Sequence, residues 1–183
     1  PMRGLFSIVV LLVSVVACAG PDPEEAPPAL TMADVERLGI ERGLVPAPGL
    51  VTGGQLTREQ MVELTALGYD TFVCLRPATE PEAGWEEDFA PGVGATFVRI
   101  PMAGPEDVSV ANAQALADVL QDADERGVVV YCASGNRVGA LFAMRAHFLQ
   151  GVGAAEALEL GRAAGLTRLE PVVQEKLGLS SPD

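Results

Sequence analysis

One stretch of the sequence limits the possible folds more than any other, because it reads as a strand, a short loop and a helix in direct succession. Residues 127–131 (GVVVY) are apolar and mostly β-branched, which is typical of a buried strand. Residues 132–137 (CASGNR) predict a loop, and residues 138–150 are apolar on most sides, which indicates a buried helix. A buried strand that runs directly into a helix is typical of a parallel sheet covered by helices.

The other segments continue this alternation of strands and helices. Residues 71–75 (TFVCL) and 96–100 are short apolar runs that predict two more strands, and residues 45–54 leave room for another. Helical patterns occur at residues 31–43, after the capping box of residues 57–60, and at residues 109–126, 154–164 and 168–177. We therefore expect an α/β fold, in which a single domain contains a mainly parallel, four- to five-stranded sheet with helices on both faces.

The beginning of the chain predicts export. Residues 1–17 place a basic side chain before an apolar run, which is the layout of a secretory signal and is too short for a comfortable membrane span. The letters VVAC that end at Cys18 resemble the lipobox of bacterial lipoproteins, with Cys18 as the lipidated residue; an ordinary cleaved signal is the alternative. Residues 18–30 include a proline-rich acidic run and predict a disordered tether, which leaves residues 31–183 as the folded domain. We expect an exported lipoprotein that is anchored to a membrane and faces the periplasm or the cell exterior.

The net charge of the chain argues against nucleic acid as a partner. Acidic side chains outnumber basic ones by 25 to 12, and the net charge is -13 at pH 7. Such a surface repels phosphate backbones, so we expect no binding to nucleic acid, and any anion site must be a local positive spot. With a single histidine, His147, and no clustered cysteines, the sequence gives little support to a metal site and indicates no cofactor.

The loop after the central strand contains the residues with the clearest chemistry. Cys132 sits where a strand gives way to a helix, and there backbone N–H groups and the helix dipole favour a reactive thiolate. Arg137 closes the loop with a planar fork of donors suited to an oxyanion. The alternative is a buried apolar cysteine beside a surface base. The pattern favours a nucleophile in an anion-binding loop whose backbone is supplied by Ala133, Ser134, Gly135 and Asn136.

Three short motifs, taken in order, resemble one protein family. They are GGQ at residues 53–55, CLRP at residues 74–77 and YCASGNRVGA at residues 131–140. Together they resemble the bacterial phosphatase-like domain of beta-lactamase-hydrolase-like proteins, which is similar in fold to dual-specificity and tyrosine phosphatases. The resemblance spans about residues 45–177. It implies a cysteine-dependent phosphatase acting on a phosphorylated small molecule or protein.

The loop also departs from the tyrosine phosphatase pattern. Four residues, rather than five, separate Cys132 from Arg137, and Tyr131 stands where a histidine is usual. Val138 replaces the usual Ser or Thr, for which Ser134 is a partial substitute. Four intervening residues also match the loop of rhodanese sulfurtransferases, so a Cys132 persulfide enzyme is the alternative function. A non-catalytic module that binds oxyanions is the second alternative.

Three more residues are candidates for the site. Asp107, in the loop of residues 102–108, is the expected general acid, although it could equally cap the following helix, and Glu106 is its substitute. Arg76 follows a strand and is expected either to reach the anion or to pair with an acid among residues 80–88. Cys74 is either a plain buried cysteine or a redox partner that forms a reversible disulfide with Cys132 in an oxidising compartment.

Overall fold

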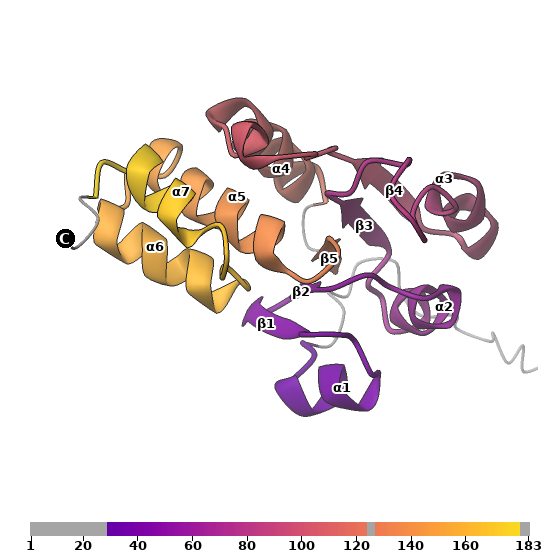
Figure 1. Ribbon diagram of the computed structural model, residues 1–183. Helices are drawn as coiled ribbons and strands as arrows, with labels where there is room; N and C mark the ends of the chain where they lie inside the picture. Colours follow the sequence, from indigo (N-terminus) through magenta and orange to yellow (C-terminus); the bar gives the residue numbers. More distant parts are fainter. Residues whose placement is uncertain (1–28, 124–126, 180–183) are drawn as a thin grey trace, which may run out of the picture.

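Five strands form the sheet at the centre of the computed structural model, which describes residues 29–123 and 127–179 (Figure 1). The order across the sheet is β1-β2-β5-β3-β4. Strands β2, β5, β3 and β4 pair in parallel, and β1 pairs with β2 antiparallel at one edge. The predicted α/β fold with a mainly parallel sheet is therefore confirmed. The strand bounds are β1 Leu44–Ala47, β2 Leu50–Gly53, β3 Thr71–Cys74, β4 Thr96–Arg99 and β5 Val128–Tyr131.

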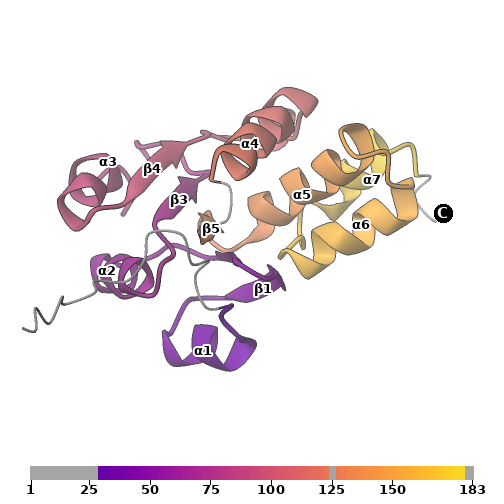
Figure 2. The same cartoon turned by 180° about the vertical axis from the view of Figure 1, so that it is seen from behind.

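Helices cover both faces of the sheet, as expected (Figures 1 and 2). The helices of one face share a core with Phe72, Val129 and Tyr131 of the sheet. The helices of the other face form a core that includes Val73 and Val130. On the first face lie α1 Met32–Arg37, α2 Arg58–Ala66, α3 Glu86–Phe89 and the 3₁₀ helix η1 Ala90–Val93. On the second lie α4 Val110–Asp122, α5 Asn136–Phe148, α6 Ala154–Ala163 and α7 Glu170–Lys176, and a further 3₁₀ helix, η2 Pro105–Asp107, precedes α4.

Two predicted segments near the start of the domain have different bounds in the structure. The helix expected over residues 31–43 ends at Arg37, because Gly39 turns the chain with φ +68° and stops it. The segment 45–54 holds two strands rather than one, since Gly49 at φ +72° forms a turn between β1 and β2. The capping box predicted at residues 57–60 is confirmed, with Thr57 Oγ1 accepting from Gln60 N at 3.2 Å.

The backbones of α5 and α6 approach each other without a side chain between them. A Cβ at Gly139 would lie 2.0 Å from Leu166 N and 2.5 Å from Gly161 O, distances that no side chain can occupy. Since α5 begins immediately after the Cys132 loop, this contact fixes the position of the loop against α6 and the following turn.

We expect Gly139→Ala to destabilise the protein by about 1–3 kcal/mol, because the new methyl group must push the two helices apart. Urea unfolding at constant m-value measures the change. Gly92→Ala is the control, since nothing lies within 4 Å of its Cβ position. Equal stability of the two variants would contradict the close approach of α5 and α6.

Residues 1–28 lie outside the part that the structure describes. The signal over residues 1–17, the lipid on Cys18 and the tether predicted over residues 18–30, as far as residue 28, therefore stay predictions. At the end of that predicted tether, Leu30 is buried in the core and its N donates to the Tyr69 hydroxyl at 3.0 Å, so the folded domain includes this residue. In the described ranges, 29–123 and 127–179, none of the helices has the length and apolar character needed to cross a membrane.

Candidate active site

The loop that follows β5 packs against the carboxyl end of β2. Cys132 N donates to Gly53 O at 3.2 Å, and Gly54 forms an antiparallel bridge with Ser134. These contacts hold the start of the loop against the end of β2, and Cys132 is only 1 % exposed to solvent. The sulfur thus belongs to a residue that water reaches poorly, at the edge where the parallel strands end.

The amino end of α5 is free to receive an anion. Gly135 is its N-cap, with φ +79°, a conformation that residues with a Cβ resist. No side chain caps the first turn, so the backbone N–H groups there keep their capacity for a ligand. The side chain of Asn136, predicted as part of the anion loop, contacts the turn after α6 instead: its Oδ1 accepts from Thr167 N at 2.9 Å and Leu169 N at 3.1 Å. Asn136 therefore holds the loop in place.

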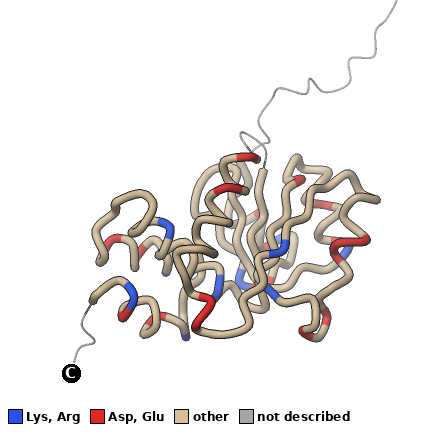
Figure 3. Tube along the Cα trace, turned by 90° about the horizontal axis from the view of Figure 1, so that it is seen from above, with Lys and Arg blue, Asp and Glu red and all other residues tan. Residues whose placement is uncertain are grey.

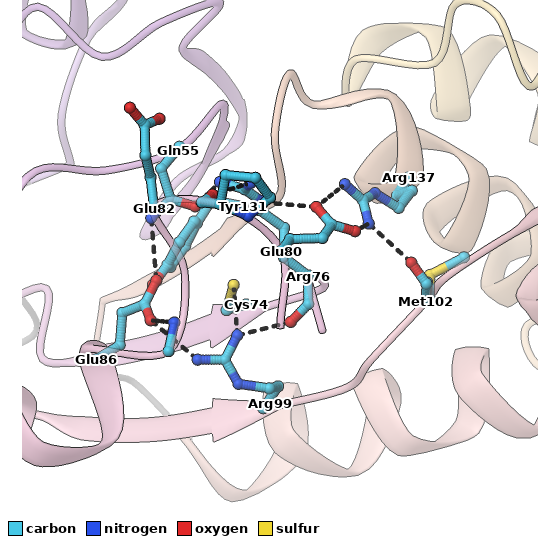
Figure 4. Close-up of polar contacts among 12 residues, drawn as sticks. Gln55, Cys74, Arg76, Glu80, Glu82, Glu86, Arg99, Met102, Tyr131 and Arg137 are labelled. Atoms are coloured by element: carbon cyan, nitrogen blue, oxygen red, sulfur yellow. Dashed lines mark hydrogen bonds and ion pairs between the residues drawn. The ribbon is translucent and has the colours of Figure 1, made fainter. Parts of the chain in front are cut away.

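Arg137 lies at one end of the polar contacts drawn in Figure 4, next to Glu80 and Met102. Its Nη1 donates to Glu80 Oε1 at 2.6 Å and to Met102 O at 2.7 Å, and its Nη2 donates to Glu80 Oε2 at 3.0 Å. The ion pair with Glu80, and to a smaller extent the charge and hydrogen bonding of Cys132, hold the pKa of Arg137 above its ordinary value. The guanidinium therefore faces both the carboxylate and the sulfur of the loop.

These contacts leave one edge of the guanidinium for a ligand. Arginine has five N–H donors, and those that Glu80 and Met102 engage lie on Nη1 and on one side of Nη2. The Nε–H and the second Nη2–H remain, and these two point in parallel from the opposite edge. A parallel pair is the fork that binds two oxygens of a phosphoryl group or similar oxyanion. Glu80 thus orients Arg137 while leaving this fork available.

Glu80 is itself held by a second arginine. Arg76 Nε donates to Glu80 Oε2 at 2.8 Å, and Arg76 Nη1 donates to Gln55 Oε1 at 2.6 Å. The hydrogen bond from Arg137, followed by that from Arg76, lowers the pKa of Glu80 to about 2. Of the two roles expected for Arg76, the structure shows the pairing with an acid, and through that acid Arg76 supports Arg137.

The same row of polar groups continues under the sheet to β4. Gln55 Nε2 donates to Glu86 Oε1 at 3.0 Å, and Arg99 Nη2 donates to Glu86 Oε2 at 2.9 Å. The Glu86 side chain is fully buried, and Arg99 also pairs with the more exposed Glu87. A buried carboxylate is tolerated only when it is paired and hydrogen-bonded, and Glu86 meets both conditions.

We expect Glu80→Gln to lower kcat on the order of 10- to 100-fold, because an amide has one acceptor oxygen and no charge, so it cannot accept from both Nη1 and Nη2 of Arg137, which loses its fixed orientation. Steady-state assays measure the loss, and Glu63→Gln, an exposed change on α2, is the control. Unchanged kcat in Glu80→Gln would contradict the orienting role.

The same variant has a pH signature. A carboxylate whose pKa falls from 4.5 to about 2 on folding adds stability that is present above pH 4.5 and is lost as the pH falls toward 2. The difference in unfolding free energy between wild type and Glu80→Gln should therefore be constant above 4.5 and shrink below it. Urea unfolding across that window measures it; a difference that grows with acid would contradict the ion pair.

Cys74 lies on the other face of the sheet from Cys132. It packs in the α1–α3 core, whereas Cys132 packs in the α4–α7 core, and both are free thiols. Arg99 Nη1 donates to Cys74 Sγ at 3.4 Å, and burial raises the pKa of the Cys74 thiol to about 11. The structure therefore does not bring together the two cysteines of the predicted disulfide; bonding them would require the sheet to open. Of the two roles expected for Cys74, the structure shows that of a plain buried cysteine.

Asp107 is tied to its own loop. Its Oδ2 accepts from Ala103 N at 2.7 Å and from Gly104 N at 3.2 Å. The cap of α4 is instead Ser109, whose Oγ accepts from Asn112 N at 3.2 Å. The predicted helix-capping role of Asp107 is therefore wrong. Its loop nevertheless begins at Met102, whose carbonyl oxygen contacts Arg137, so it borders the site. Glu106, the substitute acid, is exposed on the same loop.

A hollow of about 500 Å³ adjoins the site at Gln55. Gln55 follows the Gly54–Ser134 bridge and contacts Arg76, so it forms a wall shared with the anion loop. On the other side stands Trp85, with the Arg58 guanidinium 4.6 Å from its ring centroid. The lining consists of Glu41, Gln55, Leu56, Thr57, Arg58, Glu59, Glu82 and Trp85.

Basic segments are few in the charge view of Figure 3, and several lie toward the middle of the molecule. The arginines next to the loop, Arg76 and Arg137, are both paired with Glu80, so an anion would be bound by donors aimed at it and not by a surplus of positive charge. Within the described residues, no three His, Cys, Asp or Glu side chains are grouped so as to hold a metal ion. His147 lies on α5, with its Nδ1 2.8 Å from Val152 O, and so has a packing position.

The comparison that decides the family is with a family described as a DSP-PTPase phosphatase fused to NAD+ kinase, which matches residues 46–173. The chain belongs to this family. The matched region of the chain contains β2, the loop with Cys132 and Arg137, and helices α5 and α6. The resemblance to phosphatase-like domains inferred from the sequence motifs is thereby confirmed. No curated protein was found to match the chain.

Several solved structures share the fold of this chain. A candidate phosphatase of family DUF442 from Shewanella putrefaciens CN-32 has a TM-score of 0.60 at 19% identity, covering 79% of this chain and 95% of its own. A candidate phosphatase from Neisseria meningitidis Z2491 has a TM-score of 0.59 at 22% identity, over 72% of this chain and 96% of its own. TpbA from P. aeruginosa has a TM-score of 0.60 at 15% identity, covering 87% of this chain and 94% of its own.

Reasoning from the sequence missed the residues that orient Arg137. Glu80 was only one of several acids in the segment 80–88, and Gln55 and the carbonyl of Met102 had no role assigned. A signal was present, because the motifs GGQ and CLRP place Gln55 and Arg76 at the ends of parallel strands, where the ends of neighbouring strands meet.

Proposed function

We propose that this protein is a cysteine-dependent phosphatase in which Cys132 attacks the phosphorus of a phosphoester. One observation carries the proposal: Arg137, held by Glu80 and Met102, keeps the Nε–Nη2 edge free beside a sulfur at the uncapped amino end of α5. Membership of the family supports it. A TpbA variant was solved in complex with pTyr, so an aryl phosphoester is the first substrate class to test.

The steps balance as a two-stage displacement. The Cys132 thiolate forms a bond to phosphorus, and the bond from phosphorus to the leaving oxygen breaks. Arg137 and the loop N–H groups bind the equatorial oxygens as charge develops on them. The leaving oxygen takes a proton from Asp107. Water then attacks the phosphocysteine, the resulting Asp107 carboxylate takes the water's proton, and the thiolate and inorganic phosphate are released.

We expect Asp107→Asn to slow hydrolysis of an alkyl phosphate by about 10²-fold or more, since a poor leaving group needs the proton. Its effect on p-nitrophenyl phosphate should be far smaller, because that leaving group departs as an anion. The ratio of the two kcat/KM values measures the effect, and Glu63→Gln, an exposed change on α2, is the control. An equal loss on both substrates would contradict the acid role and indicate damage to the loop.

The spacing of the loop favours a second candidate function. With four residues between Cys132 and Arg137, the loop is shorter than that of tyrosine phosphatases and has the length found in rhodanese sulfurtransferases. In that reaction Cys132 would accept a sulfur atom from thiosulfate, release sulfite, and pass the sulfur from its persulfide to cyanide.

Parallel assays distinguish the two functions. The purified protein is offered p-nitrophenyl phosphate in one assay, and thiosulfate with cyanide in the other. Release of p-nitrophenol without thiocyanate formation supports the phosphatase. The reverse result, with a mass increase of about 32 Da on Cys132, overturns it in favour of the sulfurtransferase. Binding of vanadate or phosphate without turnover in either assay also overturns it and indicates a module that only binds oxyanions.

A further inference from the structure

A second hollow lies between α4 and α5, away from the Cys132 loop. Its volume is about 570 Å³, within the range of pockets that bind small molecules. It is formed by the α4 segment from Gln114 to Gln121 and by the end of α5 with the two residues that follow. The lining residues are Gln114, Ala117, Leu120, Gln121, Arg145, Phe148, Leu149 and Gln150.

Arg145 is the one charged residue in this lining, and its charge is poorly compensated. Its Nε is buried and has no hydrogen-bond acceptor among the described residues. When the Gln150 amide is oriented to satisfy both groups, its oxygen accepts from Arg145 Nη2 at 3.2 Å and Nη1 at 3.3 Å. Burial lowers the pKa of Arg145. The partner of this guanidinium is thus a neutral amide.

The other partly buried arginines of the described chain behave differently. Arg76, Arg99 and Arg137 each form an ion pair with a glutamate. Removing a cation from water without a counter-ion is costly, and an acidic protein has many carboxylates from which to supply one. A half-buried arginine that opens onto a hollow without a carboxylate is therefore a place where a ligand can supply the missing charge.

We propose that this hollow binds a small organic acid, with its carboxylate on Arg145 and its apolar body against Phe148 and Leu120. Phe148 is 43% exposed and offers the hollow an apolar surface against which the body of the acid can pack. The Nε2 groups of Gln121 and Gln150 in the lining can hydrogen-bond the remaining carboxylate oxygen, whereas that of Gln114 already donates to Asp118. A single cation matches the single charge of a carboxylate, whereas a phosphate dianion would retain an uncompensated charge.

The site is separate from the catalytic loop. Arg145 stands eight residues beyond Arg137 on the same helix, which is about 12 Å along the helix axis. Its ligand would therefore bind without touching Cys132, and the proposal does not depend on the reaction that the loop performs.

Titration of the ¹⁵N-labelled protein with sodium benzoate, followed by NMR, tests the proposal. We expect saturable shifts at residues of α4 and at the end of α5. Benzamide, the neutral isostere, should bind at least tenfold more weakly, because the carboxylate carries the recognition. Absence of saturable shifts, shifts confined to residues 132–137, or equal binding of benzamide would each overturn it.

Substitutions test whether the guanidinium of Arg145 binds the carboxylate. Arg145→Met keeps the length of the side chain without its charge and should weaken benzoate binding roughly tenfold or more, whereas Arg168→Met, at an exposed arginine, should leave it unchanged. Gln121→Glu, an exposed change that adds a negative charge to the hollow, should also weaken it and serves if Arg145→Met does not fold. Undiminished benzoate binding by folded Arg145→Met, or by Gln121→Glu in its place, would overturn the proposal.

Discussion

Replacing Cys132 with serine is expected to reduce turnover of p-nitrophenyl phosphate on the order of 10³-fold or more while the fold survives. A serine hydroxyl is almost the same size as the thiol, but the amino end of α5 and Arg137 cannot make it a comparable anionic nucleophile. The 1 % exposure of Cys132 means that the change is felt mainly by the loop and the adjacent core. Steady-state rates measure the loss, and thermal unfolding verifies the fold.

Cys74→Ser is the matched control for this experiment. Cys74 is as buried as Cys132 and follows the same pattern of strand and buried core, but it lies on the opposite face of the sheet. Its thiol has a pKa raised to about 11 and is neutral at pH 7. We expect this variant to keep its activity within a few-fold. Equal loss in both variants, or full activity in Cys132→Ser, would exclude Cys132 as the nucleophile.

Arg137→Lys is expected to lower kcat on the order of 10²- to 10³-fold, although the positive charge is kept. An ammonium group has no planar fork, so it cannot satisfy both Glu80 oxygens and Met102 O and still present two parallel donors to an oxyanion. Comparison of kcat with KM measures where the loss falls. It should fall mainly on kcat, since the charge that accumulates on the equatorial oxygens in the transition state is what the fork stabilises.

The control for this second variant is Arg162→Lys, at an exposed arginine of α6 that is paired with Glu159 and Glu170. It should change activity by less than twofold, because surface ion pairs contribute little. If Arg137→Lys retained activity within a few-fold, the free edge of the guanidinium would have no part in the reaction.

The fold could be predicted because the signals behind it are local. The run GVVVY at residues 127–131 is β5 almost residue for residue, since β-branched side chains suit a strand covered on both faces. The capping box at residues 57–60 likewise specifies the start of α2 from four adjacent side chains. The hairpin of β1 and β2 was less predictable, because its register depends on a turn at Gly49 rather than on apolar alternation.

The candidate site was predictable only in part. Cys132 and Arg137 belong to one loop, so their proximity follows from the chain itself. Glu80 reaches Arg137 from 57 positions away, and nothing in the sequence distinguishes it from neighbouring acids. The predicted disulfide between Cys74 and Cys132 is wrong because successive side chains of a strand point to opposite faces of the sheet. Cys74 is in register with Tyr131, so the next residue, Cys132, points to the other face.

The row of polar groups from Arg99 to Arg137 has a consequence for how a substrate arrives. Three guanidinium groups, those of Arg76, Arg99 and Arg137, face three carboxylates, so their charges cancel before anything binds. In a protein of net charge -13, no surplus of positive potential draws a phosphorylated molecule in from a distance. A phosphorylated substrate therefore reaches the site by diffusion alone, against the repulsion of the acidic surface. The protein selects it only at short range, when the phosphoryl oxygens contact the N–H donors of Arg137 and the loop.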